Sequence, residues 1–384
     1  MKKLAKVASL VLALSMVMAT LAGCGGSSNN TFKIGGIGPI TGGAAVYGQA
    51  VMNGAQIAVD EINKAGGING YQIEFKFEDD EHNAEKSVNA FNTLLDWNMQ
   101  VLMGTVTSVP CIAVVDKAAA ADVFMLTPSA TATESIGKPN AFRVCFSDPN
   151  QGTASAQYIG SHKLASKVAI IYNSSDTYSS GIKDNFVAEA KNQGFEVVAC
   201  EAFTDDTATD FTTQLQAAVN GKADLIFLPI YCEVASTILT QAAQKGMNIP
   251  FLGCDGLDGI LGLDGFDTKL AEGVLLLTPF TATASDAKTQ AFVTEYKSRC
   301  DGLVPNQFAA DAYDAIYIIK AAIEKANLTP ASSNKDIVAA LEKAMTEITF
   351  TGITGADITW GADGEPNKAP IVVEIKNGEY VVLQ

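Results

Sequence analysis

Residues 33–67 read KIGGIGPITGGAAVYGQAVMNGAQIAVDEINKAGG, an apolar segment followed by a glycine-rich turn and a long amphipathic segment. The amphipathic segment carries apolar side chains at helical spacing on one face, at Val51, Ala55, Ala58 and Ile62. Gly66 and Gly67 follow it, and glycines commonly end helices. Because residues 71–80 then alternate like a strand, we predict a strand, a crossover helix and a second, parallel strand.

The same alternation of strands and helices continues along the chain in two series. Further strands are expected at residues 99–104, 122–128, 140–147, 166–173, 195–203, 223–230, 249–254 and 272–280. Further helices are expected at residues 85–97, 109–122, 179–194, 210–222, 233–246, 286–300 and 306–326. A hairpin on an Asn-Gly turn closes the chain at residues 370–384. Because these strands are too many for one sheet, the sequence predicts two α/β lobes with parallel sheets covered on both faces.

The two series begin alike. In the first, a strand leads into a small-residue loop that contains Tyr47, followed by Gly48 and a helix. In the second, a strand leads into a polar loop that contains Tyr178, followed by Gly181 and a helix. Parallel sheets bind ligands beyond the carboxyl ends of their strands, so the two tyrosine loops are expected to face each other across a cleft. The alternative is that any strand-helix connection has a polar loop.

The stretch LTPSATAT, residues 126–133, follows a buried strand and contains small hydroxyl and alanine residues without any charge. Hydroxyl groups and backbone amides donate short hydrogen bonds. The stretch therefore either holds a small anion or forms an ordinary tight turn.

The N-terminus indicates export. Residues 1–23 begin with the lysines Lys2, Lys3 and Lys6 and continue as a short apolar run. Small residues follow, as before the cleavage site of a signal peptide. The sequence LAGC at residues 21–24 resembles a bacterial lipobox, so we expect Cys24 to be lipid-modified and residues 24–31 to form a flexible tether. The alternative is an ordinary signal peptide with an incidental cysteine.

Composition limits the class of protein. Hydrophobic residues make up 48% and charged residues 18%, as in a well-packed globular body. The net charge is −16, and residues 1–23 contain three lysines and no acid, so the remainder carries −19. This acidic balance argues against nucleic-acid binding, which needs basic residues that neutralise phosphates, and favours a role of the charge in solubility.

Cysteines and histidines favour neither a metal nor a redox site. The chain has two distant histidines, His82 and His162, and no CxxC motif, so we expect no metal and no cofactor. Cys232 and Cys254 follow successive strands and are candidates for a disulfide, with free buried thiols as the alternative.

An ordered set of motifs resembles the branched-chain amino-acid (Leu/Ile/Val-type) binding proteins of ABC transporters. The matching stretches are residues 33–81, MGTVTSVPCIAV at 103–114, FMLTPSATAT at 124–133, DTYSSG at 176–181 and FLGCDG at 251–256. The resemblance implies a type I periplasmic binding protein, with two Rossmann-like lobes joined by a three-crossing hinge. It implies a first lobe of residues 32–147 plus 279–350 and a second of residues 148–278 plus 351–384.

The resemblance also implies the ligand contacts. Ser129 and Thr131 match the positions that hold an amino acid's carboxylate, as does Ser108 at the start of a helix, where N–H groups are unpaired. Asp255 matches the acceptor for the ammonium, although the turn-rich CDGLDG around it also fits a plain turn residue. The family's aromatic positions fall on Tyr47, Tyr178, Tyr231 and Phe308, of which Phe308 fits core packing equally well.

Two departures from the family pattern stand out. Members often carry a disulfide whose positions fall here near His82 and Thr107, so that bridge is absent. The residues that face the ligand's side chain are the least fixed by the match, so a branched-chain ligand is a default.

The implied partners are a free amino acid, the membrane subunits of an ABC permease and a membrane reached through the lipid anchor, with the protein itself a monomer. No catalytic residue is expected, because Gly36 and Gly38 are followed by Thr41 where a dinucleotide loop needs glycine, and no P-loop or GxSxG motif occurs. The alternatives are a ligand-sensing module of the same fold, which binds an amide or an aromatic acid, and an extracellular enzyme.

Overall fold

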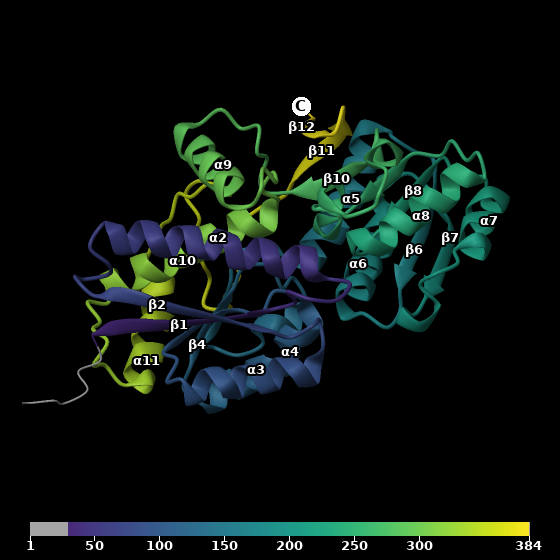
Figure 1. Ribbon diagram of the computed structural model, residues 1–384. Coiled ribbons are helices and arrows are strands. Elements are labelled where there is room, and N and C mark those ends of the chain that lie inside the picture. The colour runs from purple at the N-terminus through teal and green to yellow at the C-terminus, as the bar shows by residue number, and fades with distance from the viewer. Residues whose placement is uncertain (1–29, 384) are drawn as a thin grey trace, which may run out of the picture.

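The computed structural model describes residues 30–383, which form two lobes, each built on one β-sheet (Figure 1). The first sheet has the order β2-β1-β3-β4-β5, and all its neighbours are parallel. It consists of β1 (Thr31–Gly38), β2 (Gln72–Asp79), β3 (Val101–Gly104), β4 (Phe124–Thr127) and β5 (Ala141–Arg143). The predicted signal peptide, Cys24 and nearly all of the predicted tether lie outside the described residues.

The second sheet has the order β12-β11-β10-β9-β8-β6-β7, in which only β11 and β12 run antiparallel to their neighbours. Its strands are β6 (Lys167–Asn173), β7 (Glu196–Phe203), β8 (Leu225–Leu228), β9 (Phe251–Gly253), β10 (Leu275–Thr278), β11 (Ile371–Lys376) and β12 (Glu379–Val382). The two-lobe α/β fold with parallel sheets is thereby confirmed.

Helices cover both faces of each sheet. The first lobe has α2 (Ala45–Lys64), α3 (Ala84–Asp96), α4 (Ser108–Ala120), α9 (Ala287–Arg299), α10 (Gln307–Lys325) and α11 (Asn334–Met345). The second has α5 (Asp148–His162), α6 (Thr177–Gln193), α7 (Thr212–Gly221) and α8 (Cys232–Gln244). Among residues 30–383, no helix combines the length and apolar character needed to cross a membrane.

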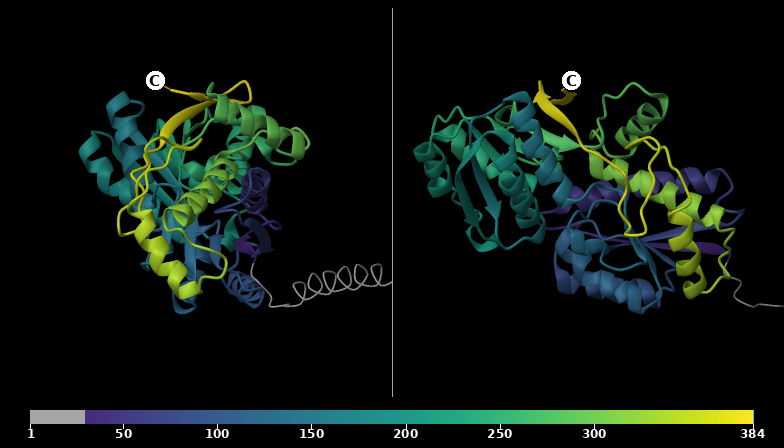
Figure 2. Two further views of the ribbon diagram at one scale, coloured as in Figure 1. Left: turned by 90° about the vertical axis from the view of Figure 1, so that its left-hand side faces the viewer. Right: turned by 180° about the vertical axis from the view of Figure 1, so that it is seen from behind.

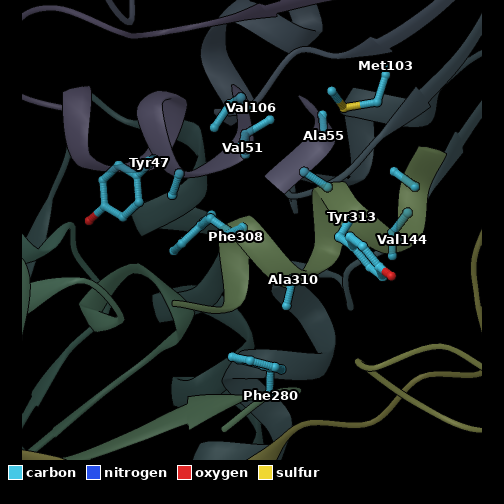
Figure 3. Close-up of a cluster of buried hydrophobic side chains, with 14 of the residues drawn as sticks. Tyr47, Val51, Ala55, Met103, Val106, Val144, Phe280, Phe308, Ala310 and Tyr313 are labelled. Atoms are coloured by element: carbon cyan, nitrogen blue, oxygen red, sulfur yellow. The ribbon is translucent and has the colours of Figure 1, made fainter. Parts of the chain in front are cut away.

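Alternate residues of each strand point into different cores. Strand residues such as Ile34 and Met103 pack under α2 and α10, while Ile37 and Leu102 pack under α3 and α4. Figure 3 shows the α2 and α10 side chains of the first of these cores. The helices α2 and α10 approach closely at Gly54, where an added Cβ would lie 2.0 Å from the Ala309 carbonyl oxygen. Only glycine fits this crossing.

The chain passes between the two lobes three times (Figures 1 and 2). The crossings run from β5 to α5, from β10 to α9, and from the segment before β11 into β11. Residues 351–368, which we expected in the second lobe, instead contact the first. Trp360 Nε1 donates to the Arg143 carbonyl oxygen at 2.7 Å, and Thr354 Oγ1 donates to Asp314 Oδ2 at 2.7 Å. The boundary predicted at residue 351 is therefore too early, and the third crossing follows Lys368.

Two helices were not expected from the sequence. The helix α5 buries mainly small residues against α6, where a Cβ on Gly152 would lie 2.4 Å from the Ile182 carbonyl oxygen. Close packing of small residues leaves Ile159 as the one large apolar side chain on the buried face of α5, which is too few to mark a helical period. The helix α11 does carry a signal, because Ser333 caps it and its buried face contains Ile337 and Leu341.

The six cysteines within the described residues are free thiols. The candidate disulfide between Cys232 and Cys254 does not form, and the alternative of free buried thiols holds at both positions, because the two side chains pack in different cores, on opposite faces of the second sheet. Cys232 lies among α8 residues, whereas Cys254 Sγ is 4.0 Å from Ser155 Oγ on α5.

A buried ion pair holds the third crossing against the first lobe. Lys368 Nζ lies 2.7 Å from Asp311 Oδ1, with 3% and 2% of the two side chains exposed. Lys368 Nζ also donates to Thr354 Oγ1 at 2.8 Å. The position of the segment before β11 thus depends on charges that water does not reach.

Replacing Lys368 by Met should destabilise the protein by about 3–5 kcal/mol, because the Asp311 carboxylate is left buried without its partner. The matched control is Lys376→Met, which breaks an exposed pair with Glu374 and should cost less than about 1 kcal/mol. Urea unfolding followed by far-ultraviolet circular dichroism measures both. Equal midpoints for the two variants would contradict the role given to the buried pair.

Candidate ligand-binding site

The predicted site residues all follow the carboxyl ends of strands or begin helices that face the other lobe. Ser108 begins α4 after β3, and Ser129 and Thr131 follow β4. In the second lobe, Tyr178 lies in the first turn of α6, and the other two residues follow β8 and β9, namely Tyr231 and Asp255. The remaining two residues, Tyr47 and Phe308, belong to the first turns of α2 and α10.

The loop at residues 129–132 is held by a guanidinium with no exposed surface. Arg143 donates from Nη1 to the carbonyl oxygens of Ala130 (3.1 Å) and Thr131 (2.5 Å), and from Nη2 to that of Ala132 (2.9 Å). The Asp148 N–H also donates to the Thr131 carbonyl oxygen at 2.9 Å. The loop therefore has a fixed shape before any ligand binds.

The two serines of this half differ in their free hydrogen-bonding capacity. Ser108 Oγ accepts from the Ala132 N–H at 3.2 Å, so its own O–H remains available as a donor. Ser129 Oγ donates to the Val106 carbonyl oxygen at 2.8 Å, so its proton is already committed within the first lobe. Of the two hydroxyls, only that of Ser108 can donate to an anion without breaking a bond seen here.

Asp255 is a buried acidic residue whose carboxylate is bonded within the second lobe and whose backbone is bonded from both lobes. Its Oδ1 accepts from the Tyr178 hydroxyl at 2.7 Å, and its N–H donates to Gln151 Oε1 at 3.0 Å. Gln307 Nε2, from α10 of the first lobe, donates to the Asp255 carbonyl oxygen at 2.8 Å. Burial raises the pKa of Asp255 to about 7, and the bond from Tyr178 opposes the rise. Asp255 also begins the short 3-10 helix η3 (Asp255–Leu257), so its backbone forms a turn as well.

Aromatic rings join the lobes beside Asp255. The Tyr47 hydroxyl donates to the Gly256 carbonyl oxygen at 2.5 Å and accepts from the Cys232 N–H at 2.8 Å, both across the cleft. The Tyr178 and Tyr231 rings stack with centroids 4.8 Å apart, and Tyr47 lies 5.3 Å from Tyr231. The bonds of Tyr47 and its contact with Tyr231 therefore join the two lobes directly.

Phe308 packs edge-on against Tyr47, with centroids 4.6 Å apart, and is 4% exposed (Figure 3). It lies in the same core as Val51. The structure therefore brings Phe308 to the site through Tyr47 and also gives it the core role considered from the sequence.

A hydrogen bond joins the two positions at which family members often carry a disulfide. His82 Nδ1 lies 2.9 Å from Thr107 Oγ1, which links the loop after β2 to the loop before α4. Burial lowers the pKa of His82, and its ring meets Tyr231 edge-on at 5.4 Å.

Four polar residues of the site were missed from the sequence: Arg143, Asp148, Gln151 and Gln307. Asp148 is 2% exposed, and its Oδ1 has no hydrogen-bond partner among the described residues. Its burial raises the pKa well above the ordinary range. The run SDPNQG around it is a visible helix start, but nothing local places its side chains against residues 129–132 or Asp255.

Known proteins match the chain over most of its length. A family model described as periplasmic binding protein matches residues 31–379. The Leu/Ile/Val-binding protein BraC3 of Rhizobium johnstonii is 32% identical over 326 residues, covering 84% of this chain and 85% of its own. The leucine-, isoleucine-, valine-, threonine-, and alanine-binding protein of Pseudomonas aeruginosa is 29% identical, covering 90% and 91%.

Solved structures agree with the fold. The leucine binding protein LivK of Thermotoga maritima has a TM-score of 0.82 at 28% identity, covering 92% of this chain and 98% of its own. LivJ of Streptococcus pneumoniae, solved with isoleucine, has a TM-score of 0.82 at 29% identity, covering 92% and 100%. A benzoate complex of a Rhodopseudomonas palustris solute binding protein shares the fold, with a TM-score of 0.81 at 22% identity and coverage of 92% and 95%. The chain belongs to the periplasmic binding protein family.

Proposed function

We propose that this protein is the solute-binding lipoprotein of an ABC importer and captures a free amino acid, branched-chain by default, between its lobes outside the cytoplasm. The observation that carries the proposal is the Asp255 carboxylate, buried beside Tyr178 in the second lobe, together with the uncharged loop of hydroxyls and amides at residues 129–132 of the first. Burial raises the pKa of the Tyr231 hydroxyl, the charges of Asp176 and Asp255 add to the rise, and the Ser108 backbone opposes it, as suits a ring between the two halves. A buried acceptor from one lobe and a set of neutral donors from the other suit the two charges of a zwitterion.

Each end of an amino acid has a matching partner in the proposed pose. The carboxylate receives the Ser108 O–H and the N–H groups at the start of α4, where the helix dipole favours an anion. The ammonium donates to Asp255 in a charge-assisted hydrogen bond. The rings of Tyr47, Tyr231 and Phe308 offer apolar surface to the side chain.

Closure of the lobes couples binding to transport in this proposal. The Tyr47 hydroxyl and the Gln307 amide bond across the cleft to backbone groups of the second lobe, so separating the lobes here would break these bonds. A ligand held by residues of both lobes adds to them and shifts the population toward closure. The closed monomer then docks on the permease, while the lipid on Cys24 keeps it at the membrane.

Two solved structures of similar proteins contain ligands that bear on the choice of ligand here. LivJ was solved with isoleucine at 29% identity, which favours a branched-chain ligand. The benzoate-binding neighbour, at 22% identity, supports only the fold. We propose no catalytic activity, and transport is preferred over sensing because LivJ is described as the substrate binding protein of a branched-chain amino acid transporter.

Asp255→Ala should weaken amino-acid binding by about 2–5 kcal/mol, because the ammonium loses its buried charged partner. The protein is first unfolded and refolded to remove carried-over ligand. A thermal-shift screen of all amino acids and common amides then identifies the ligand, since a ligand that binds only the folded state raises the melting temperature. Calorimetry compares the variants.

The matched control for this test is Asp264→Ala, which removes an exposed acid from the neighbouring loop and should leave affinity unchanged. Unchanged affinity in a folded Asp255→Ala protein would show that the ammonium site is elsewhere. If only an amide or an aromatic acid raises the melting temperature, that compound is the ligand and the amino-acid proposal is wrong.

Binding and stability should depend on pH in opposite directions. The pKa of Asp255 is about 7 in the folded protein, above its ordinary value of 3.8, so the folded state holds a proton that the unfolded state has lost between these values. The stability of the unliganded protein should therefore fall as pH rises from about 4 to about 7. Amino-acid affinity should instead fall as pH drops below about 7, because the ammonium requires the ionised carboxylate.

Asp80 and Asp258 have pKa values raised to about 7 as well, so the informative quantity is the difference between wild type and Asp255→Asn. Thermal unfolding and calorimetry from pH 5.5 to 8.5 measure it. If the variant keeps the full pH dependence of both stability and affinity, Asp255 is not the titrating group.

A further inference from the structure

Gln307 bonds from the first lobe to the peptide group between Asp255 and Gly256 in the second. It is the first residue of α10 and is 2% exposed, and its Nε2 donates to the Asp255 carbonyl oxygen at 2.8 Å. On the other side of the same peptide group, the Gly256 N–H donates to the Tyr178 hydroxyl oxygen at 2.9 Å. One peptide group therefore connects an amide of the first lobe with a tyrosine of the second.

The Tyr178 hydroxyl continues this connection to the side chain of Asp255. Its oxygen accepts from the Gly256 N–H, and its own proton is donated to Asp255 Oδ1 at 2.7 Å. Burial raises the pKa of Tyr178 well above the ordinary range, so the hydroxyl keeps the proton that it donates. The three bonds form a directed series from Gln307, through the peptide group and Tyr178, to the carboxylate.

The direction of this series favours a charged carboxylate at its end. A carbonyl oxygen only accepts and an N–H only donates, so the bonds at the peptide group have one possible direction. A charged Asp255 accepts the last bond, whereas a protonated Asp255 presents a competing O–H. Hydrogen bonds in series polarise one another, and bonds to a charged acceptor are the strongest. The amide of Gln307 therefore strengthens the bond that stabilises the charge on Asp255.

Gln307 is the member of the series that depends on the position of the lobes. Asp255, Gly256 and Tyr178 all belong to the second lobe, so their bonds survive when the lobes separate. The bond from Gln307 crosses the cleft and is lost on separation. The charged form of Asp255 is therefore stabilised more in the closed arrangement than in the open one.

We propose that Gln307 is a positioning residue for the ammonium site, which makes closure of the lobes favour the charged form of Asp255 and makes that charge favour closure. The inference rests on the proposed function, in which Asp255 accepts the ammonium of an amino acid. A site that closes more readily when its acceptor is charged closes most readily when it is able to bind.

Tyr47 provides a matched comparison within the same cleft. Its hydroxyl also crosses between the lobes, but it donates to the Gly256 carbonyl oxygen, which belongs to the next peptide group along the chain. That peptide group is not part of the series that leads to Tyr178. Loss of the Tyr47 hydroxyl should therefore weaken closure at every pH, without linking closure to the charge on Asp255.

Other titratable groups surround the series, and all of them remain when Gln307 is replaced. Asp258 accepts from the Gln307 N–H at 2.8 Å and lies beside Tyr380. The groups whose charge acts with that of Asp255 are Asp148 on α5, Tyr178 on α6, Tyr231 before α8, Asp311 on α10, and the thiols of Cys145 and Cys254. The informative quantity is therefore the difference between variants and wild type.

The first test needs no ligand. Small-angle X-ray scattering measures the radius of gyration of the refolded, unliganded full-length chain from about pH 6 to about pH 8.5, across the range in which Asp255 ionises. In wild type the radius should fall as pH rises, because the charged carboxylate favours closure. In Gln307→Met this fall should be reduced to about half or less, because methionine fills a similar space without a donor. Tyr47→Phe should have a larger radius at every pH and keep the fall.

The second test uses isoleucine and calorimetry. At about pH 8.5, Gln307→Met and Tyr47→Phe should each bind about fivefold more weakly than wild type, because each loses one bond between the lobes. At about pH 7, Gln307→Met should lose about a further threefold, because its Asp255 is less often charged. Tyr47→Phe should show the same loss at both pH values.

Circular dichroism checks that the variants fold. If Gln307→Met does not fold, Gln307→Asn replaces it, since asparagine keeps an amide in the first turn of α10 but is one methylene too short to reach the Asp255 carbonyl oxygen.

A pH-dependent radius that is the same in the Gln307 variant and in wild type would overturn the inference and leave the proposed function standing. An equal loss of isoleucine affinity at both pH values in the Gln307 variant would also overturn it. If wild type binds no amino acid, the proposed function fails, and the scattering measurement still decides whether Gln307 couples closure to the charge on Asp255.

Discussion

The buried guanidinium of Arg143 organises the half of the site that faces an anion. It donates to three successive carbonyl oxygens, those of residues 130–132. The backbone carbonyl oxygen of Arg143 accepts from the Trp360 indole N–H. Glu365 lies 3.3 Å from Nη2 and supplies a counter-charge. Because Glu365 and Trp360 belong to the segment before the third crossing, the loop at the cleft and the hinge share one set of polar contacts.

The closed arrangement of the lobes depends on hydrogen bonds that are few but buried. The Tyr47 hydroxyl both donates to and accepts from backbone groups of the second lobe, and Gln307 on α10 donates to the Asp255 carbonyl oxygen. Such bonds contribute roughly 1 kcal/mol each, so they bias a hinge without locking it. The contacts that a bound solute makes with both lobes can therefore shift the equilibrium of such a hinge.

The sequence predicted local features well and long-range ones poorly. The strand, turn and helix at residues 33–67 are visible because their apolar periodicity follows from local geometry. The helix α5 was not predicted because it packs small residues closely. The position of residues 351–368 was not predictable because it depends on contacts with Arg143 and Asp311, which are distant in sequence.

The site shows the same division. Tyr47, Tyr178, Tyr231 and Asp255 were found from their places after strands and from motif resemblance, and the structure brings them together. Arg143, Gln151 and Gln307 support them from other elements, and no local pattern marks such partners. The Ser129 hydroxyl shows the limit of motif reasoning, because its proton is used inside the lobe.

The free cysteines have a consequence for how this chain matures. Since no covalent bridge joins distant parts of residues 30–383, folding after export requires no oxidase and no disulfide shuffling. The stability of residues 30–383 comes from packing, hydrogen bonds and charges, so a reductant removes no bond that this fold needs. The thiol that needs care in handling is that of Cys200, which is exposed on β7 and can cross-link two molecules in air.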